Sequence, residues 1–166
     1  PYFSRKIGLQ SGNPIPILYG GRIIGKIGKV EIAAQQVKTR KTDLVNSEDF
    51  SVLRLKQNFL KESSIGILYT RRHTTNGEQL TEPLQDRNTF GIDLTLNTSS
   101  FLSNQNLQFQ AFAIMHNPES PNDLNNSMWD RSARGLRFNF PNQPWSGSLS
   151  YREFGNSYDP AVGFSR

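Results

Sequence analysis

The feature that most constrains this chain is a repeated alternation of apolar and polar residues. Residues 89–97, TFGIDLTLN, show it most clearly. One side of the extended segment carries Phe90, Ile92, Leu94 and Leu96, and the other carries Thr89, Gly91, Asp93, Thr95 and Asn97. A period of two predicts a β-strand with one apolar and one polar face. The apolar face lines the core in a soluble domain, whereas in a membrane barrel it meets lipid and the polar face lines the lumen.

The same alternation recurs along the chain, and helical periodicity is nearly absent. The predicted strands are 17–27, 30–39, 50–59, 64–72, 89–97, 106–115, 133–140 and 147–154. Between the first two, Gly28 and Lys29 form a candidate two-residue hairpin, because glycine accepts the positive φ that such turns require. The sequence therefore predicts an all-β fold, an antiparallel up-and-down meander of about eight strands.

The predicted strands divide the chain into three parts. Residues 1–16 form a lead-in segment, residues 17–154 the wall of strands, and residues 155–166 a loop with the possible start of a further strand. The chain begins at Pro1 without an initiator methionine and ends in GFSR, and no signal peptide is visible. We therefore expect it to be a fragment of a larger chain.

The connections between the predicted strands alternate in length. Those at 28–29, 60–63 and 141–146 are short, those at 40–49, 73–88 and 116–131 are long, and the one at 98–105 is of medium length. Tight turns at one end and long loops at the other are typical of outer-membrane barrels, and a soluble β-sandwich has no reason to show them. The rhythm favours a sheet that forms part of a transmembrane β-barrel. Alternation itself is commonest in soluble open sheets and sandwiches, so the residues leave both classes open.

Composition excludes several classes of protein. The chain has no cysteine, which excludes a disulfide framework, a thiol nucleophile and a zinc-thiolate site. No apolar run approaches the about 18 residues of a spanning helix. A barrel strand needs only about 9–11 residues of alternating character, so the negative mean hydropathy does not decide between soluble and membrane classes. The net charge of +5 can favour anionic solutes, acidic head groups or nucleic acid, or can belong to an ordinary solvated surface.

The polar faces of the predicted strands carry many basic and amide side chains at mid-strand positions. The candidate lumen-facing residues are Arg22, Lys26, Arg54, Lys56, Arg72, Asp93, Arg137, Asn139 and Arg152, and Gln108, Gln110, Ser148 and Ser150 share these faces. Such a lumen would have a positive field that favours polar or anionic solutes if it is open. The alternative is a closed barrel, in which these charges pair with acids on further strands or on a plug.

Asp93 is expected to be a lone inward acid that pairs with a basic side chain on a neighbouring strand.

Aromatic residues near the strand ends would form interfacial girdles in a barrel and would pack in the core or turns of a soluble fold. They are Tyr19, Tyr69, Phe90, Phe140, Trp145 and Tyr151.

The sequence offers no catalytic constellation. His73 and His116 lack a metal-binding spacing and, lying in or beside loops, are expected to be solvated. GGRIIGKIG lacks the helix and the G-K-[ST] ending of a phosphate loop, and no G-x-S-x-G elbow occurs. Basic residues are spread over nearly every strand rather than clustered with stacking aromatics. We therefore expect no enzyme activity, no cofactor or metal, and no nucleic-acid partner.

Four stretches resemble one bacterial family: PYFSRKIGL (1–9), PIPILYGGRIIGKIGKVEIAAQQVKT (14–39), FSVLRLKQNFLKESSIGILYTRR (50–72) and YDPAVGFSR (158–166). Its members carry an N-terminal domain similar to family-nine carbohydrate-binding modules, followed by a large outer-membrane β-barrel of uncharacterised function. The matching positions are Phe3, Ser4, Arg5, Lys6, Ile7, Gly8, Gly21, Arg22, Gly25, Lys26, Val52, Arg54, Lys56, Asp159, Pro160, Gly163 and Phe164. Tyr2 stands where the family has a phenylalanine, Lys6 conservatively replaces an arginine, and residues 74–135 match in character only.

The resemblance implies that the chain is a fragment of the barrel, located in the outer membrane of a Gram-negative bacterium. The barrel would have more than eight strands, and the sugar-binding character of the N-terminal domain does not transfer to the residues of this chain. The expected partners are outer-membrane lipid, other outer-membrane or secretion-system proteins, and a polar or anionic solute crossing a porin-like lumen. The competing hypothesis is a soluble all-β module that binds a ligand or carbohydrate.

Overall fold

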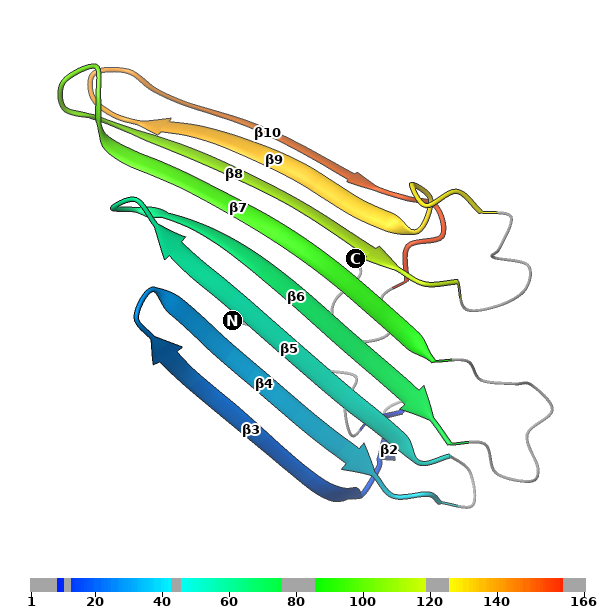
Figure 1. Cartoon of the computed structure of the whole chain (residues 1–166). Coiled ribbons are helices and arrows are strands. Elements are labelled where there is room, and N and C mark those ends of the chain that lie inside the picture. Colours follow the sequence, from blue (N-terminus) through cyan, green and yellow to red (C-terminus); the bar gives the residue numbers. More distant parts are fainter. Residues whose placement is uncertain (1–8, 11–12, 43–45, 76–85, 119–125, 160–166) are drawn as a thin grey trace.

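One antiparallel sheet of eight strands dominates the computed structural model, which describes residues 9–10, 13–42, 46–75, 86–118 and 126–159. The strands are β3 (Ile17–Ile27), β4 (Val30–Thr39), β5 (Glu48–Phe59), β6 (Ser63–Thr74), β7 (Arg87–Phe101), β8 (Gln105–His116), β9 (Ser132–Pro141) and β10 (Ser146–Phe154). Their spatial order is β10-β9-β8-β7-β6-β5-β4-β3, so each strand pairs with its neighbours in sequence (Figure 1). No helix occurs in these ranges. The prediction of an all-β up-and-down meander is confirmed.

The β3–β4 hairpin has the predicted limits. Its turn residue Gly28 has φ +58°, the positive value that favours glycine at this place. At the other end of β3 the register shifts, because Ile17 opposes Thr39 while Tyr19 opposes the adjacent Lys38. Adjacent residues of β4 project from opposite faces, so this bulge separates Ile17 from the face of Tyr19. Strict alternation along residues 17–27 predicts that Ile17 shares a face with Tyr19, and the bulge makes this prediction wrong.

The strand β7 is longer than predicted. It continues to Phe101, so most of the predicted medium-length turn at 98–105 is strand, and the turn is confined to residues 102–104. Leu102 and Ser103 adopt positive φ there without glycine. A small β1 (Leu9–Gln10) and β2 (Asn13–Pro14) pair precedes the large sheet within the predicted lead-in segment.

With the strand limits of the structure, the connections between successive strands alternate regularly between short and long. Residues 28–29, 60–62, 102–104 and 142–145 form the short turns at one end of the sheet. Residues 40–47, 75–86 and 117–131 form the long connections at the other end, which lies on the right in Figure 1. Below, the two ends are called the turn end and the long-connection end.

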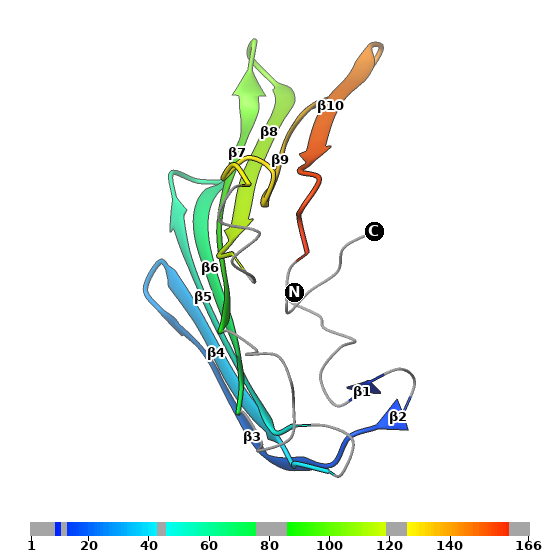
Figure 2. The same ribbon diagram turned by 90° about the vertical axis from the view of Figure 1, so that its right-hand side faces the viewer.

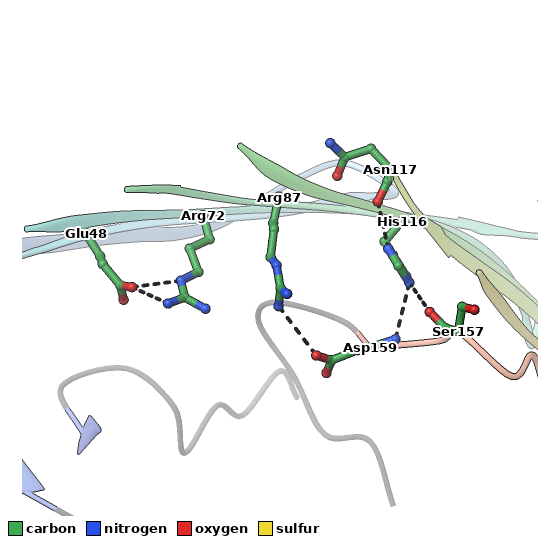
Figure 3. A network of polar contacts seen from close by, with 7 residues as sticks. All are labelled: Glu48, Arg72, Arg87, His116, Asn117, Ser157 and Asp159. Atoms are coloured by element: carbon green, nitrogen blue, oxygen red, sulfur yellow. Dashed lines mark hydrogen bonds and ion pairs between the residues drawn. The ribbon is translucent and has the colours of Figure 1, made fainter. Parts of the chain in front are cut away.

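The sheet is curved, and its two faces are distinct. Figure 2 shows the curvature, with residues 155–159 after β10 and the β1–β2 pair lying on the concave side. In Figure 3 the side chains of Arg72, Arg87 and His116 project toward Ser157 and Asp159, which follow β10. The face that carries Arg72 and His116 is therefore the concave face, and the opposite face is convex.

The buried apolar residues are few. Among the described residues they are Ile15, Val37, Phe50, Val52 and Ala133. Val37 opposes Phe50 in the β4–β5 ladder, and Val52 lies two positions from Phe50 on the same strand. These three residues therefore form a small cluster on the concave face, toward the long-connection end. The sheet and the other described residues therefore do not enclose a large apolar core.

Candidate functional site

The strand register places all the candidate residues on the concave face. Directly opposed residues of neighbouring strands project from the same face. One cross-strand row runs through Lys26, Glu31, Lys56, Gly66, Asp93, Phe112, Gly135 and Arg152. The other candidates lie at alternate positions of the same strands: Arg22 opposes Gln35, Arg54 opposes Ala33, Arg72 opposes Phe50, Arg137 opposes Gln110 and Asn139 opposes Gln108.

Arg54 and Asp93 form a bidentate ion pair across β6. Arg54 Nη2 donates to Asp93 Oδ1 at 2.9 Å, and Nη1 contacts Oδ2. Gly66 of β6 directly opposes Asp93, and a Cβ at position 66 would lie 2.7 Å from Cζ of Arg54. The guanidinium therefore occupies the space that a side chain at position 66 would fill. Asp93 is paired with a basic side chain, as expected. That side chain lies on β5, which β6 separates from β7, and not on a strand adjacent to β7.

Two further acids lie on the concave face, so Asp93 is not the lone inward acid that was predicted. Glu31 Oε1 accepts a hydrogen bond from Asn58 Nδ2 at 2.8 Å, and Glu31 Oε2 lies 3.9 Å from Lys56 Nζ. Glu48 accepts a hydrogen bond from Arg72 Nε at 3.0 Å and also contacts Arg72 Nη2. The sequence predicts a loop at 40–49 and therefore misses Glu48, whereas β5 begins with this residue.

The guanidinium groups of Arg22, Arg137 and Arg152 have no hydrogen bond or ion pair within the described part of the chain. Arg22 lies on the edge strand β3. Arg137 and Arg152 lie on neighbouring strands at the other side of the sheet, where Arg137 opposes Ser150 and Arg152 opposes Gly135. Within the described residues, concave-face arginines without a partner therefore lie toward both edges of the sheet, on β3 at one side and on β9 and β10 at the other.

Arg137 lines a small polar niche with three amide side chains. Gln108, Gln110, Arg137 and Asn139 surround a volume of about 80 Å³. Asn139 Nδ2 donates to Gln108 Oε1 at 3.0 Å, which fixes two of the amides relative to each other. The niche lies on the concave face, between β8 and β9.

The prediction that His116 is solvated is wrong, because its exposed fraction is 8%. His116 lies at the end of β8, where its Nδ1 is 2.8 Å from the carbonyl oxygen of Asn117 (Figure 3). Its Nε2 lies 2.9 Å from the carbonyl oxygen of Ser157 and 3.2 Å from the backbone nitrogen of Asp159. The chain that follows β10 therefore covers this histidine.

Further contacts hold the segment after β10 against the concave face. The backbone N–H groups of Gly155 and Ser157 donate to the carbonyl oxygens of Ser132 and Asp130, at 2.8 Å and 2.9 Å. Arg87 Nη1 lies 3.5 Å from Asp159 Oδ2. Burial, and secondarily the charge of Asp159, raise the pKa of the Tyr158 hydroxyl above its ordinary value. The possible further strand in residues 160–166 lies outside the described residues.

The convex face carries exposed apolar side chains from one edge of the sheet to the other. They include Ile23, Ile27, Leu53, Ile65, Ile67, Tyr69, Phe90, Ile92, Leu96, Leu136, Phe138, Leu149 and Tyr151. The exposed fraction is 73% for Ile23 and 41% for Ile92. The apolar residues of the segment 89–97 therefore do not lie in a closed core.

Charged residues on the convex face are confined to the long-connection end. In the described strands they are Lys38, Asp49, Arg71, His73, Arg134 and Glu153, each close to the end of its strand. Arg71 Nη2 is 2.7 Å from Asp86 Oδ2, and Arg134 Nη2 is 2.5 Å from Glu153 Oε1. His73 also contacts Asp86, just before β7. The remainder of the convex face is free of charge in the strands described.

The described residues contain neither a cluster of metal ligands nor a helix that could cross a membrane. Among them, no group of three or more His, Cys, Asp or Glu side chains could hold a metal ion. No helix in the described ranges is long and apolar enough to cross a membrane.

No family model, curated protein or solved structure matches this chain. The family resemblance therefore rests on the motif residues alone. Of these, Phe3, Ser4, Arg5, Lys6, Ile7, Gly8, Pro160, Gly163 and Phe164 lie outside the described residues, whereas the motif arginines and lysines of β3 and β5 lie on the concave face.

Proposed function

We propose that this chain is part of the wall of an outer-membrane β-barrel in a Gram-negative bacterium, with the convex face against lipid and the concave face toward the lumen. The observation that carries the proposal is the convex face itself. It is apolar across the sheet, it is not covered by any described part of the chain, and its charges are confined to one end.

The apolar convex face would be solvated differently in a membrane and in water. Soluble monomers rarely expose contiguous apolar patches larger than a few hundred Å², because water is an unfavourable neighbour for such surface. Lipid chains solvate the same surface without this cost, provided that the backbone polar groups are satisfied by strand pairing. The inner strands of the sheet meet this condition through ladders on both sides.

The strand lengths and the placement of charge support the same orientation. The strands of the large sheet run from 9 residues in β10 to 15 in β7, compared with about 9–11 for a tilted spanning strand. Convex charges at the long-connection end would lie at the level of head groups and water. Concave charges occur at mid-strand, where they would face a polar lumen and are in part neutralised by ion pairs such as Arg54–Asp93.

Closure of the barrel would need strands beyond those described here. Within the described residues, β3 and β10 each pair on one side only, and an open edge is not tolerated in a bilayer. The motif resemblance to a family with a large barrel supports the presence of these further strands. We propose a porin-like or secretion-associated barrel whose lumen admits polar or anionic solutes.

The proposal is tested by fractionating a Gram-negative host that expresses the full-length protein. We expect the protein in the outer membrane, with migration in a detergent gel that changes on boiling, as a folded barrel shows. A freely soluble, monodisperse protein with a cooperative thermal transition would instead support a soluble all-β binding module. Planar-bilayer conductance then separates an open pore from a closed wall.

A further inference from the structure

Within the described residues, the positive charge of the concave face is balanced by acids on β4 to β7, in the middle of the sheet, and is not balanced toward its edges. On β4 to β7, Glu31, Glu48 and Asp93 each face a lysine or arginine. The concave positions of β8, β9 and β10 carry Arg137 and Arg152 and no carboxylate within the described residues. Asp93 cannot compensate them, because both of its carboxylate oxygens contact Arg54.

Arg137 lies in surroundings that would hold an oxygen-rich anion. A guanidinium presents a planar fork of donors, and Arg137 has no acceptor among the described residues. Gln110 opposes it directly and has no hydrogen-bond partner in the described chain either, so its amide N–H groups are available. The Gln108 contact with Asn139 engages the oxygen Oε1, and Gln108 Nε2 has no hydrogen-bond acceptor among the described residues.

The niche has room for a small group but not for a large solute. A buried water needs about 10–15 Å³ of comparable volume, so about 80 Å³ accommodates several waters or the head of one anion. The strand beside β9 contributes Ser148 and Ser150, opposite Asn139 and Arg137, and these short side chains add hydroxyl groups next to the niche.

We propose that the niche formed by Gln108, Gln110, Arg137 and Asn139 binds the oxyanion group of a polar solute, a carboxylate or a phosphate. This rests on the proposed function, since it assigns the solute site of the same lumen wall. The Arg137 guanidinium binds two anion oxygens, and the amide N–H groups of Gln108 and Gln110 donate to the others. Arg152 adds a second positive charge nearby without an opposing acid.

The test uses the full-length protein in detergent micelles, with inorganic phosphate as the probe and the ³¹P line width as the readout. Arg137→Gln removes the proposed anchor. Arg22→Gln is the matched control, because it removes the same charge from the same face at the opposite edge of the sheet. We expect phosphate to bind the unmodified protein, affinity to fall by about tenfold or more in Arg137→Gln, and Arg22→Gln to bind as the unmodified protein does.

A second variant tests the contribution of an amide side chain, and a competing anion tests which chemical class the niche binds. Gln110→Ala should weaken phosphate binding by a smaller factor, and each variant is first shown to retain heat-modifiable migration. Displacement of phosphate by acetate would assign carboxylates to the niche as well, whereas failure of acetate would assign phosphates alone. The inference is overturned if the unmodified protein leaves the phosphate line unbroadened, or if Arg22→Gln and Arg137→Gln weaken binding equally. Either result in a protein that still resides in the outer membrane leaves the proposed function intact.

Discussion

Arg54 of β5 and Asp93 of β7 form a bidentate ion pair over Gly66 of β6, the strand that separates them. The pair joins three strands through their side chains. A slip of one residue in either ladder would turn one partner to the convex face. The contact therefore favours a single register at the centre of the sheet, and it gives Gly66 a structural role.

A double-mutant cycle should detect this pair. The side chains of Arg54 and Asp93 are 28% and 34% exposed, so solvent weakens the attraction. We expect a coupling free energy of about 0.5–1 kcal/mol between Arg54→Gln and Asp93→Asn. Reversible unfolding by urea in lipid vesicles provides the measurement. Additive effects of the two substitutions would show that the pair contributes no coupling.

Substitution of Gly66 by alanine should remove that coupling. The new Cβ would lie 2.7 Å from Cζ of Arg54, and the guanidinium, as the end of a flexible side chain, would move aside. In the Gly66→Ala background we expect the coupling between positions 54 and 93 to fall to near zero. Gly91→Ala, on the same face of the neighbouring strand, is a control that should preserve it. A coupling unchanged by Gly66→Ala would contradict the role of the glycine.

Charge introduced on the convex face should be costly in the membrane. Ile92 lies near the middle of β7 and is exposed on the convex face, whereas Thr95 lies on the concave face. We expect Ile92→Arg to lower the free energy of unfolding in lipid vesicles by about 2–4 kcal/mol. Thr95→Arg, the matched control, should change it by less than about 1 kcal/mol. Equal small effects at the two positions would indicate that both faces meet water.

Asp86 should give the long-connection end a pH dependence. A hydrogen bond from His73, and then one from Arg71, lower the pKa of the Asp86 carboxyl. Because this folded-state pKa lies below that of the unfolded chain, about 3.9, the contribution of Asp86 is complete above the unfolded value. It is lost as the pH falls through the folded value.

The stability difference between unmodified protein and Asp86→Asn measures this contribution. The difference should be constant near neutral pH and should vanish in strong acid. In His73→Ala the pKa of Asp86, followed by carboxyl NMR, should return toward its ordinary range. A stability difference that stays constant down to the lowest pH would contradict the account.

The strands could be predicted from the sequence wherever alternation ended at a strong turn signal. Gly28 marks such a turn, and the flanking β3 and β4 have the predicted limits. The residues Thr98, Ser99 and Ser100 have the composition of a turn but belong to β7, because β8 pairs with Thr98 and, beyond an irregularity in the register, with Phe101. Such pairing depends on a second segment that local composition does not reveal.

The candidate residues could be assigned to a common face, but their partners could not. The alternation fixed the face of Arg54 and Asp93, whereas their contact depends on the small size of Gly66 between them. The burial of His116 depends on the chain near Ser157, far along the sequence, folding back over the sheet. Neither relation leaves a signal in the spacing of the residues themselves.

The most direct test of the central claim is a spin-label scan of residues 89–97 in the full-length protein in lipid vesicles. The chain contains no cysteine, so single cysteines can be introduced in this segment without native ones in the same chain. We predict that collisions with oxygen, which concentrates in lipid, are most frequent at positions 90, 92, 94 and 96. Collisions with a water-soluble nickel reagent should be most frequent at the intervening positions. Two results would contradict the account. If positions 90, 92, 94 and 96 collide least with both reagents, these side chains are buried. If they collide most with the nickel reagent, the convex face meets water and not lipid.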